Sequence, residues 1–423
     1  MTLQKTSNFE KMKPLFPKLA LFDPLAAILP TTQQTWLLNA CLSSGERGLH
    51  AWIKWKESVL DPIKVLGQGK QGYKRLLPLL FTSLNNNQIS VDKAFLTYLR
   101  TAYVREEVRH KTFQKICRLV FEHLTRKDIP VIVIRGTALA ESVYESPLFR
   151  HCHDIDLLVR DEDIHSVIRT LQEIRVTPSR QFHTFGTTIR TMKHESDLPV
   201  ALHTQLFSIP FYNVAPAEQW ARSEWNTISG MSMRTLSPCD NLLHICGNAA
   251  VSNRRGGIGW VCDSWMIIHR TPNLDWDQVN FESKRQRLTL PLLVIFSYFA
   301  SELQAAIPEE FLRQLNDSGR QADWLSQDAA LLSSRIRTGE GKRSFFRRAR
   351  TWTSKTAVLR SMLLPSHAYL RWIEPAASTW RLPFFYYLYR LIKYITRLSR
   401  FFWGKWVIRF LGKNTFLATK ENR

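Results

Sequence analysis

The segment Arg150-His-Cys-His-Asp-Ile-Asp-Leu-Leu-Val159 decides the fold and carries the residues best suited to chemistry. Its second half is a short apolar run that predicts a buried strand. Successive side chains of a strand point to opposite faces, so Asp154 and Asp156 share one face while Ile155 turns into the core. Two carboxylates on one face repel each other unless a cation or a proton lies between them. The segment therefore predicts a cation site at the start of a strand.

Magnesium is the natural occupant of such a site. Mg²⁺ takes hard oxygen ligands and is usually shared between one or two carboxylates and the phosphates of a substrate. We therefore expect Asp154 and Asp156 to bind Mg²⁺ (or Mn²⁺). An Asp-x-Asp pair by itself is a weak signal, because surface strands and turns also carry it.

The sequence upstream strengthens the interpretation. Ile129-Pro-Val-Ile-Val-Ile134 predicts another buried strand, and a helix is expected from Ala138 to Tyr144. Between them, Arg135-Gly-Thr137 forms the kind of tight turn and helix start where backbone N–H groups hold a phosphate. Gly136 allows close approach of the backbone, and the Thr137 hydroxyl is expected either to donate to the ligand or to act as the helix N-cap.

The rest of the chain divides into helical and mixed regions. The mixed region continues with a helix from Glu162 to Ile174 and with strands at Thr187–Met192 and Leu198–Phe207. The flanking regions show helical periodicity, first at Gln33–Ser44, Tyr73–Leu84 and Val91–Leu124, and then from Ala215 to Asn316, including Cys239–Val251, Gly259–Arg270 and Trp276–Gln286. We expect a helical N-terminal region (1–125), an α/β core (126–212), a helical domain (213–338) and a basic aromatic tail (339–423).

The ordered series from Ile134 to Val159 resembles an uncharacterised bacterial nucleotidyltransferase family related to the polymerase-beta superfamily. The family's pattern is a Lys-Gly turn, a helix ending near Tyr-Pro, an Arg and then Asp-Ile-Asp-Leu-Leu-Val. The resemblance covers about residues 95–320, and it continues through Leu202-His203, Leu236-Ser-Pro-Cys-Asp-Asn-Leu-Leu-His244, Ile258-Gly-Trp-Val-Cys-Asp263 and Leu274-Asp-Trp-Asp277.

This resemblance implies an α+β fold in which a small mixed-sheet nucleotidyltransferase core is flanked by helical N-terminal and C-terminal regions. It implies an enzyme that moves a nucleotidyl group from an NTP to a hydroxyl-bearing acceptor. The nucleotide-binding residues implied are Arg135, Gly136, Thr137 and Arg150. The acceptor is not visible in the sequence, so a small molecule, a peptide, a protein and RNA all remain open.

Two departures from the family's pattern bear on activity. Arg135 replaces the usual lysine, which keeps the charge but changes the donor geometry. Ala201 stands where the superfamily has the third carboxylate, the group that helps to bind metal and activates the acceptor. His203 lies two residues after Ala201 and on the same face of the strand. It is expected to take part of that role or to be a structural histidine. Alternatively, Glu195 or Asp197 reaches in, or the domain is catalytically degenerate and binds a nucleotide or partner as an accessory protein.

The helical half after the strands is expected to close over the nucleotide and acceptor. Within it, Trp260 and Asp263 share one helix face, as do Asn241 and His244, and packing is the favoured role for all four. The apolar stretch Leu288–Ala300 is too short to span a membrane and predicts a buried helix.

Positive charge is concentrated at the C-terminus. Residues Gly341 to Arg423 hold 18 Lys and Arg against two Glu, which gives +16 of the total +22. In the segment 382–411, cations recur every three to five residues among aromatic and aliphatic side chains, the composition of a helix at an anionic membrane surface. Docking onto the protein itself or a partner is the second interpretation, and nucleic-acid binding is less favoured. The N-terminus shows no apolar signal segment and the six cysteines show no disulfide pattern, so we expect a cytoplasmic protein. Association with an anionic membrane surface is the favoured role of segment 382–411.

Overall fold

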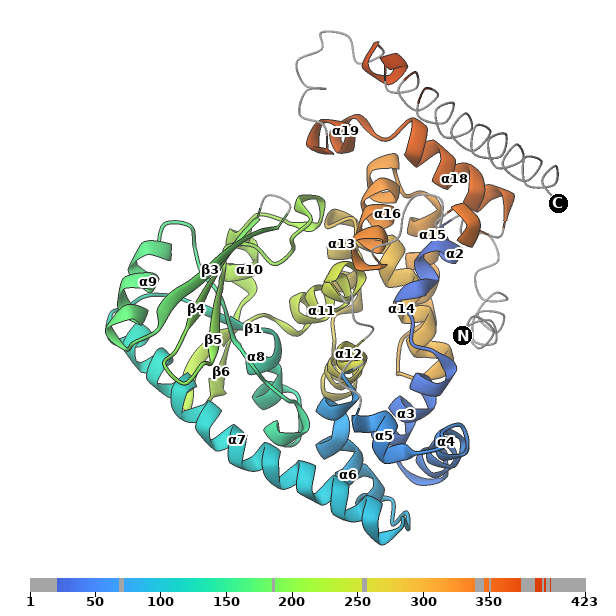
Figure 1. The fold of residues 1–423 in the computed structure, drawn as a ribbon. Coiled ribbons are helices and arrows are strands. Elements are labelled where there is room, and N and C mark those ends of the chain that lie inside the picture. The colour runs from blue at the N-terminus through green and yellow to red at the C-terminus, as the bar shows by residue number, and fades with distance from the viewer. Residues whose placement is uncertain are drawn as a thin grey trace, which may run out of the picture.

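A computed structural model of the chain describes residues 21–67, 72–184, 187–252, 257–338, 346–349 and 351–373, with residues 385–389, 392 and 396 beyond them. The described residues build one mixed sheet of seven strands in the order β3-β4-β5-β2-β1-β7-β6 (Figure 1). The strands are β1 Ile132–Ile134, β2 Ile155–Leu158, β3 Thr177–Thr184, β4 Thr187–Lys193, β5 Pro199–His203, β6 Glu224–Ile228 and β7 Met231–Thr235. The expected α+β class, with a mixed-sheet core between helical regions, is confirmed.

Strand β2 lies in the middle of this sheet. It runs antiparallel to β1, with Asp156 opposite Ile134, and parallel to β5, with Asp156 opposite Ala201. A central strand covered on both faces has to be apolar on both, and Ile155, Leu157 and Leu158 are fully buried. Asp156 is the exception in this strand, and it lies on the same face as Leu158.

The two faces of the sheet are covered by different helices. Ile155 and Leu157 pack in a cluster with the long helix α7 (Lys93–Arg126) and with α9 (Ile164–Glu173). Leu158 belongs to the larger cluster that joins the sheet to the N-terminal and C-terminal helices. Asp156, on the same face of β2 as Leu158, therefore faces the helical half of the molecule.

The helices for which bounds were expected begin and end close to those bounds. Before the sheet they are α2 Phe22–Leu25, α3 Thr32–Leu42, α4 Gly45–Glu57, α5 Pro62–Gly67, α6 Leu77–Asn86 and α7. Within the sheet region they are α8 Arg135–Ser142, α9 and α10 Pro216–Arg222. After it come α11 Pro238–Ser252, α12 Gly259–Arg270, α13 Trp276–Arg285, α14 Thr289–Glu302, α15 Glu309–Arg320, α16 Trp324–Thr338, α18 Trp352–Leu363 and α19 His367–Ile373.

Individual helices show why their sequences form them. Asp92 caps α7 by accepting a hydrogen bond from the backbone N–H of Phe95, which satisfies one of the free donors of the first turn. Helix α14 is buried from Thr289 to Phe299, in agreement with the buried helix expected there.

Two expectations about secondary structure were wrong. Helical structure was expected from Ala215 onward, but β6 and β7 form an antiparallel hairpin, and β7 pairs in parallel with β1. The turn residues Ser229 and Gly230 both have positive φ, as a two-residue hairpin turn requires. The sheet also gains β3 at one edge, a segment to which no strand was assigned. The sheet therefore extends past residue 212, the end of the expected core.

The tail segment 382–411 lies mostly outside the described residues. Within the part of the chain that the structure describes, no helix combines the length and the apolar character needed to cross a membrane.

Candidate active site

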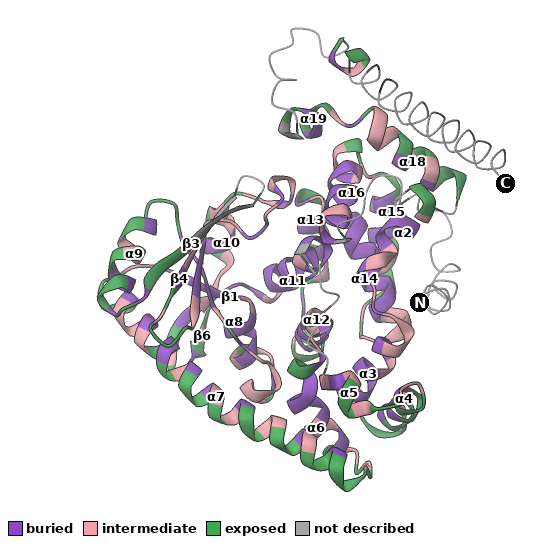
Figure 2. Cartoon of the chain, viewed as in Figure 1, coloured by how far each residue is buried: buried purple, intermediate pink, exposed green. Residues whose placement is uncertain are grey.

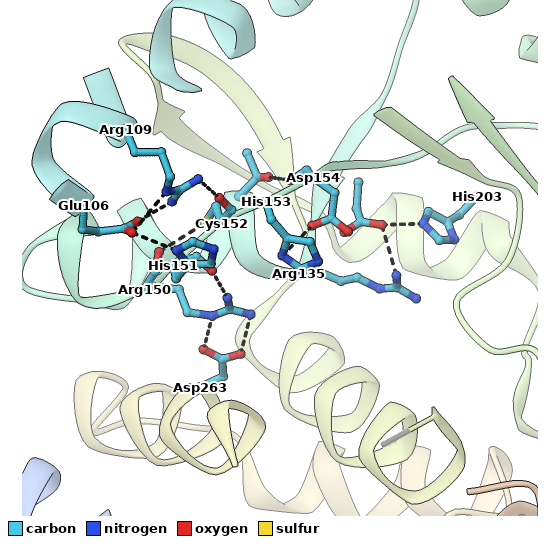
Figure 3. A network of polar contacts seen from close by, with 12 residues as sticks. Glu106, Arg109, Arg135, Arg150, His151, Cys152, His153, Asp154, His203 and Asp263 are labelled. Atoms are coloured by element: carbon cyan, nitrogen blue, oxygen red, sulfur yellow. Dashed lines mark hydrogen bonds and ion pairs between the residues drawn. The ribbon is translucent and has the colours of Figure 1, made fainter. Parts of the chain in front are cut away.

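Asp154 and Asp156 come together at the start of β2, in very different surroundings. Asp154 directly precedes the strand and keeps 31% of its side chain exposed, whereas the Asp156 side chain keeps 4%. Both face the helical half, as the alternation of the strand predicts. Figure 3 shows Asp154 between His153 on one side and the contacts of Arg135 and His203 on the other.

Asp156 has two partners, which contact the same carboxylate oxygen. The Nε2–H of His203 donates to Oδ1 at 2.7 Å, and Nη1 of Arg135 donates to Oδ1 at 3.1 Å. Burial alone would raise the pKa of Asp156, but Arg135 and His203 hold it well below its usual range. Burial and the nearby Arg135 lower the pKa of His203, so its ring is neutral and its Nε2 proton points to Asp156.

The surroundings of Asp154 raise its pKa, whereas those of Asp156 lower it. Burial and the negative charge of Asp156 raise the pKa of Asp154 to about 6. Nδ1 of His153 lies 3.7 Å from Asp154 Oδ1, but burial and the charge of Arg75 lower the pKa of His153 to about 4, so its ring is neutral at pH 7. Asp154 is therefore a carboxylate that an added cation would stabilise.

The turn from β1 into α8 supplies the groups expected at a phosphate. Arg135 adopts a left-handed backbone conformation with φ of 60°, an uncommon state for a residue other than glycine. At Gly136 a Cβ would lie 3.2 Å from the Arg150 guanidinium, so glycine lets that group pack against the backbone. Thr137 donates its hydroxyl to the Asp154 carbonyl at 3.1 Å. The N-cap role considered for Thr137 is wrong, because the helix begins at Arg135 and its N-cap is Ile134, without a side-chain cap.

Arg150 forms a bridge to the helical half. Its Nε and Nη2 donate to the two oxygens of Asp263 in α12, at 2.7 and 3.0 Å, and the Tyr144 hydroxyl donates to the same carboxylate at 2.7 Å. Burial disfavours the charged guanidinium, but Asp263 more than compensates and raises the pKa of Arg150. Asp263, for which packing was the favoured role, is thus the ionic partner that sequence reasoning missed.

A second network fixes the segment that leads into the carboxylate pair. Glu106 in α7 accepts from Nδ1 of His151 at 2.8 Å and from Nε of Arg109 at 3.1 Å, and Arg109 also donates to the Cys152 carbonyl (Figure 3). Burial would raise the pKa of Glu106, but the hydrogen bonds and charges of His151 and Arg109 lower it to about 2. The sequence carries no signal that pairs Glu106 with His151, 45 positions away.

Ala201, which stands where the family resemblance implies a third carboxylate, lies directly opposite Asp156 on the neighbouring strand. Neither alternative carboxylate reaches it, because Glu195 pairs with Arg175 at 3.0 Å and Asp197 pairs with Lys193 at 2.6 Å, both on the surface. His203 is the residue of this strand that contacts Asp156. Among the described residues, no cluster of three or more His, Cys, Asp or Glu side chains is arranged to bind a metal ion.

A cavity of about 480 Å³ is lined by Arg135, whose guanidinium contacts Asp156, and by residues of α8, α11 and α12, whereas Asp154 and Asp156 themselves do not line it. Three arginines contribute to its wall, and α11 and α12 add polar and aromatic side chains. The residues that matter for its chemistry are Arg75, Arg135, Arg150, His244, Asn248 and Trp260. His244 is held by Asn248 at 2.7 Å, and Asn241 instead bonds the Leu236 carbonyl at 2.9 Å. The cavity wall therefore holds three guanidinium groups, of which that of Arg150 is paired with Asp263 in the same wall and that of Arg135 with Asp156, and α11 and α12 form one side of it.

The mixed sheet thus places two aspartates at the start of a central strand, next to Arg135 in the wall of a cavity that three arginines line. The model of the family "Uncharacterised nucleotidyltransferase" matches residues 72–304, which is more than half of the chain. The chain therefore belongs to this family of uncharacterised nucleotidyltransferases. No curated protein sequence and no solved structure matches it.

Proposed function

We propose that this domain transfers a nucleotidyl group from an NTP to a hydroxyl-bearing acceptor. The observation that carries the proposal is the Asp154 and Asp156 pair beside the arginine-lined cavity. In the reaction the acceptor oxygen attacks the α-phosphorus, the bond from that phosphorus to the bridging oxygen of the β-phosphate breaks, and pyrophosphate leaves. The proton of the acceptor hydroxyl passes to solvent. The family assignment supports nucleotidyl transfer in general, and the acceptor remains open.

The carboxylate pair fits Mg²⁺ (or Mn²⁺). Both groups are hard oxygen donors, and the unfavourable charge at Asp154 is what a cation would relieve. His203 and Arg135 both contact Oδ1 of Asp156, and no described residue donates a hydrogen bond to its Oδ2. A bound cation would neutralise charge that develops on the oxygens of the transferred phosphate.

The chain's own residues supply the remaining interactions. Arg135 lines the cavity, its side chain is 33% exposed, and its Nε has no partner among the described residues, so it can donate to a phosphate. The uncapped backbone N–H groups at the start of α8, including that of Gly136, offer further donors. His203 is a positioning residue, because its proton is directed to Asp156 and keeps that carboxylate ionised and oriented.

Labelled NTPs, a divalent metal and a panel of acceptors, incubated with the full chain, test the proposal. We expect acceptor labelling and pyrophosphate release that the double substitution Asp154→Ala, Asp156→Ala abolishes. Asp161→Ala, an exposed carboxylate just after β2, is the matched control and should retain activity. Transfer that survives the double substitution would overturn the proposed centre.

Ala201 supports a second candidate, a catalytically degenerate domain that binds a nucleotide or partner and acts as an accessory protein. Ala201 lies opposite Asp156, where the family resemblance implies the third carboxylate. Ala201→Asp separates the two functions. Transfer that appears only in this variant would support the degenerate domain, whereas transfer by the natural chain that the substitution leaves unchanged would rule it out.

A further inference from the structure

The C-terminal helices expose an unusual amount of apolar surface. Of the 18 large hydrophobic side chains that are exposed among the described residues, eight lie between positions 346 and 392. Single exposed hydrophobic residues need no explanation, but a concentration of them marks an interaction surface. The eight are Phe346, Trp352, Leu359, Leu364, Phe385, Leu388, Tyr389 and Ile392.

Helix α18 shows how this surface arises. Ser354 and Val358 are buried on the face that packs against α16 and α2, whereas Trp352 is 80% exposed on the outer face. Figure 2 shows that part of α18 is exposed. Leu359 follows Trp352 at helical spacing and is exposed as well, although a surface helix normally carries polar side chains on its outer face. The outward face of α18 therefore exposes two large apolar side chains, Trp352 and Leu359, alongside the polar Thr353 and Thr356.

The short stretch 385–389 adds to the same region because it is attached to the neighbouring helix. The Tyr387 hydroxyl donates to the Pro365 carbonyl at 2.7 Å, and Tyr386 is buried against Leu370 of α19. With these two tyrosines turned toward the protein, Phe385 and Leu388 are left exposed.

Positive charge accompanies the apolar surface. From Gly341 to Ile373 the chain has eight Lys and Arg and no Asp or Glu. Nζ of Lys355 lies 5.2 Å from the centroid of the Trp352 ring, so a cation and an aromatic ring project from the same part of α18. Amphipathic side chains of this kind place their apolar part at the acyl boundary and their charge among lipid headgroups.

We propose that this C-terminal patch, formed by the eight exposed hydrophobic side chains with Arg347, Lys355 and Arg371, docks the protein on an anionic membrane surface. The inference is independent of the proposed function. Nucleic acid would match the charge, but Leu359, Leu364 and Ile392 have no aromatic face on which a base could stack. Anionic lipid matches both the charge and the aliphatic side chains.

Co-sedimentation of the full chain with phosphatidylcholine vesicles, with and without phosphatidylserine, tests the proposal. We expect binding that requires phosphatidylserine at low salt. The triple substitution Trp352→Ser, Leu359→Ser, Leu364→Ser should weaken binding at low and at high salt, because apolar burial is not screened by ions. The matched control is Trp225→Ser, Phe281→Ser, two exposed aromatic residues on β6 and α13, which should bind as the natural chain does.

The charge of the patch is tested separately with Arg347→Gln, Lys355→Gln, Arg371→Gln. Each lost charge should weaken binding to phosphatidylserine vesicles roughly fivefold, and added salt should abolish the difference from the natural chain. Trp352→Ser alone removes a side chain that is 80% exposed, so it provides a readout even if the triple variants fail to fold.

Three outcomes would overturn the proposal. The first is a full-length chain that ignores phosphatidylserine vesicles. The second is an equal loss of binding in the Trp225 and Phe281 control, and the third is binding that the serine substitutions in the patch leave unchanged. Salt-sensitive binding to a single-stranded oligonucleotide, together with no vesicle binding, would instead assign the patch to nucleic acid.

Discussion

The Glu106 network, which contains Arg109 and His151, and the aspartate pair, Asp154 and Asp156, lie at the two ends of one short segment. The two sites differ in how their negative charge is balanced. Glu106 accepts hydrogen bonds from Arg109 and His151, and its pKa falls to about 2. Asp154 faces a second carboxylate, and its pKa rises to about 6. In the Glu106 network the negative charge is balanced by protein side chains, and the network holds the backbone of the segment in place. The aspartate pair keeps excess negative charge. The difference separates an ion network whose charges are balanced within the protein from a carboxylate pair whose charges are not, which is why we propose the pair as the ligand site.

Asp156→Asn should give the largest effect. It removes one of the two negative charges of the aspartate pair. We therefore expect the rate of nucleotidyl transfer to fall by about a thousandfold, which corresponds to an activation barrier higher by about 4 kcal/mol. Pyrophosphate release measures it. Asp161→Asn serves as the control, and a fall of less than about tenfold for Asp156→Asn would contradict the assignment.

Glu106→Gln should disrupt the Glu106 network. Arg109 and His151 would lose their carboxylate in a largely buried position, so we expect the free energy of unfolding to fall by about 2 to 3 kcal/mol. Urea denaturation measures this effect. Glu107→Gln, at the next and more exposed position of α7, should change stability little. Equal effects of the two substitutions would show that the Glu106 network does not stabilise the fold.

The pH dependence of stability should identify the same cluster. The folded-state pKa of Glu106, about 2, lies below its ordinary value of 4.5, so its stabilising contribution is present above pH 4.5 and is lost as the pH falls toward 2. We expect about 2 kcal/mol to disappear across that window. The stability difference between the natural chain and Glu106→Gln should therefore shrink at about pH 3. A difference that stays constant with pH would contradict this prediction.

Asp154→Asn should have the smallest effect on stability, and it should stabilise the protein, whereas Glu106→Gln destabilises it. Because the folded-state pKa of Asp154 is raised, its ionisation destabilises the fold as the pH rises from about 4 to 6. Removing the charge should stabilise the protein by about 1 kcal/mol at pH 7, a value reduced for partial exposure. The same substitution should weaken nucleotidyl transfer. Loss of stability in urea denaturation would mean that Asp154 is already neutralised.

Local sequence pattern predicted the parts of the fold that depend on alternation and apolar runs. Strand β2 and helix α14 followed from these signals, as did the shared face of Asp154 and Asp156. Strand β3 was missed because its polar residues and Pro178 gave no apolar pattern. The β6–β7 hairpin had a usable signal in Ser229-Gly230, which the surrounding helical periodicity outweighed.

The partners of the site residues could not be predicted in the same way. Contacts such as Arg150 with Asp263, 113 residues apart, depend on how helices pack on the sheet rather than on local spacing. Only the family resemblance placed Asp263 in an ordered motif, and it gave no partner. The family resemblance alone drew attention to Ala201, and its pairing opposite Asp156 depends on the register between β2 and β5, which a period of two within each strand does not determine.

The parallel pairing of β1 with β7 has a consequence for how the chain folds. β1 meets β2 after about twenty residues of chain, but β7 arrives about a hundred residues later, and such distant pairing forms slowly. Until then β1 is an open edge made of Ile132, Val133 and Ile134, an apolar strand able to pair with another chain. A nascent or truncated chain that ends before β7 should therefore aggregate, so a shortened protein that retains the sheet has to include residues up to Thr235.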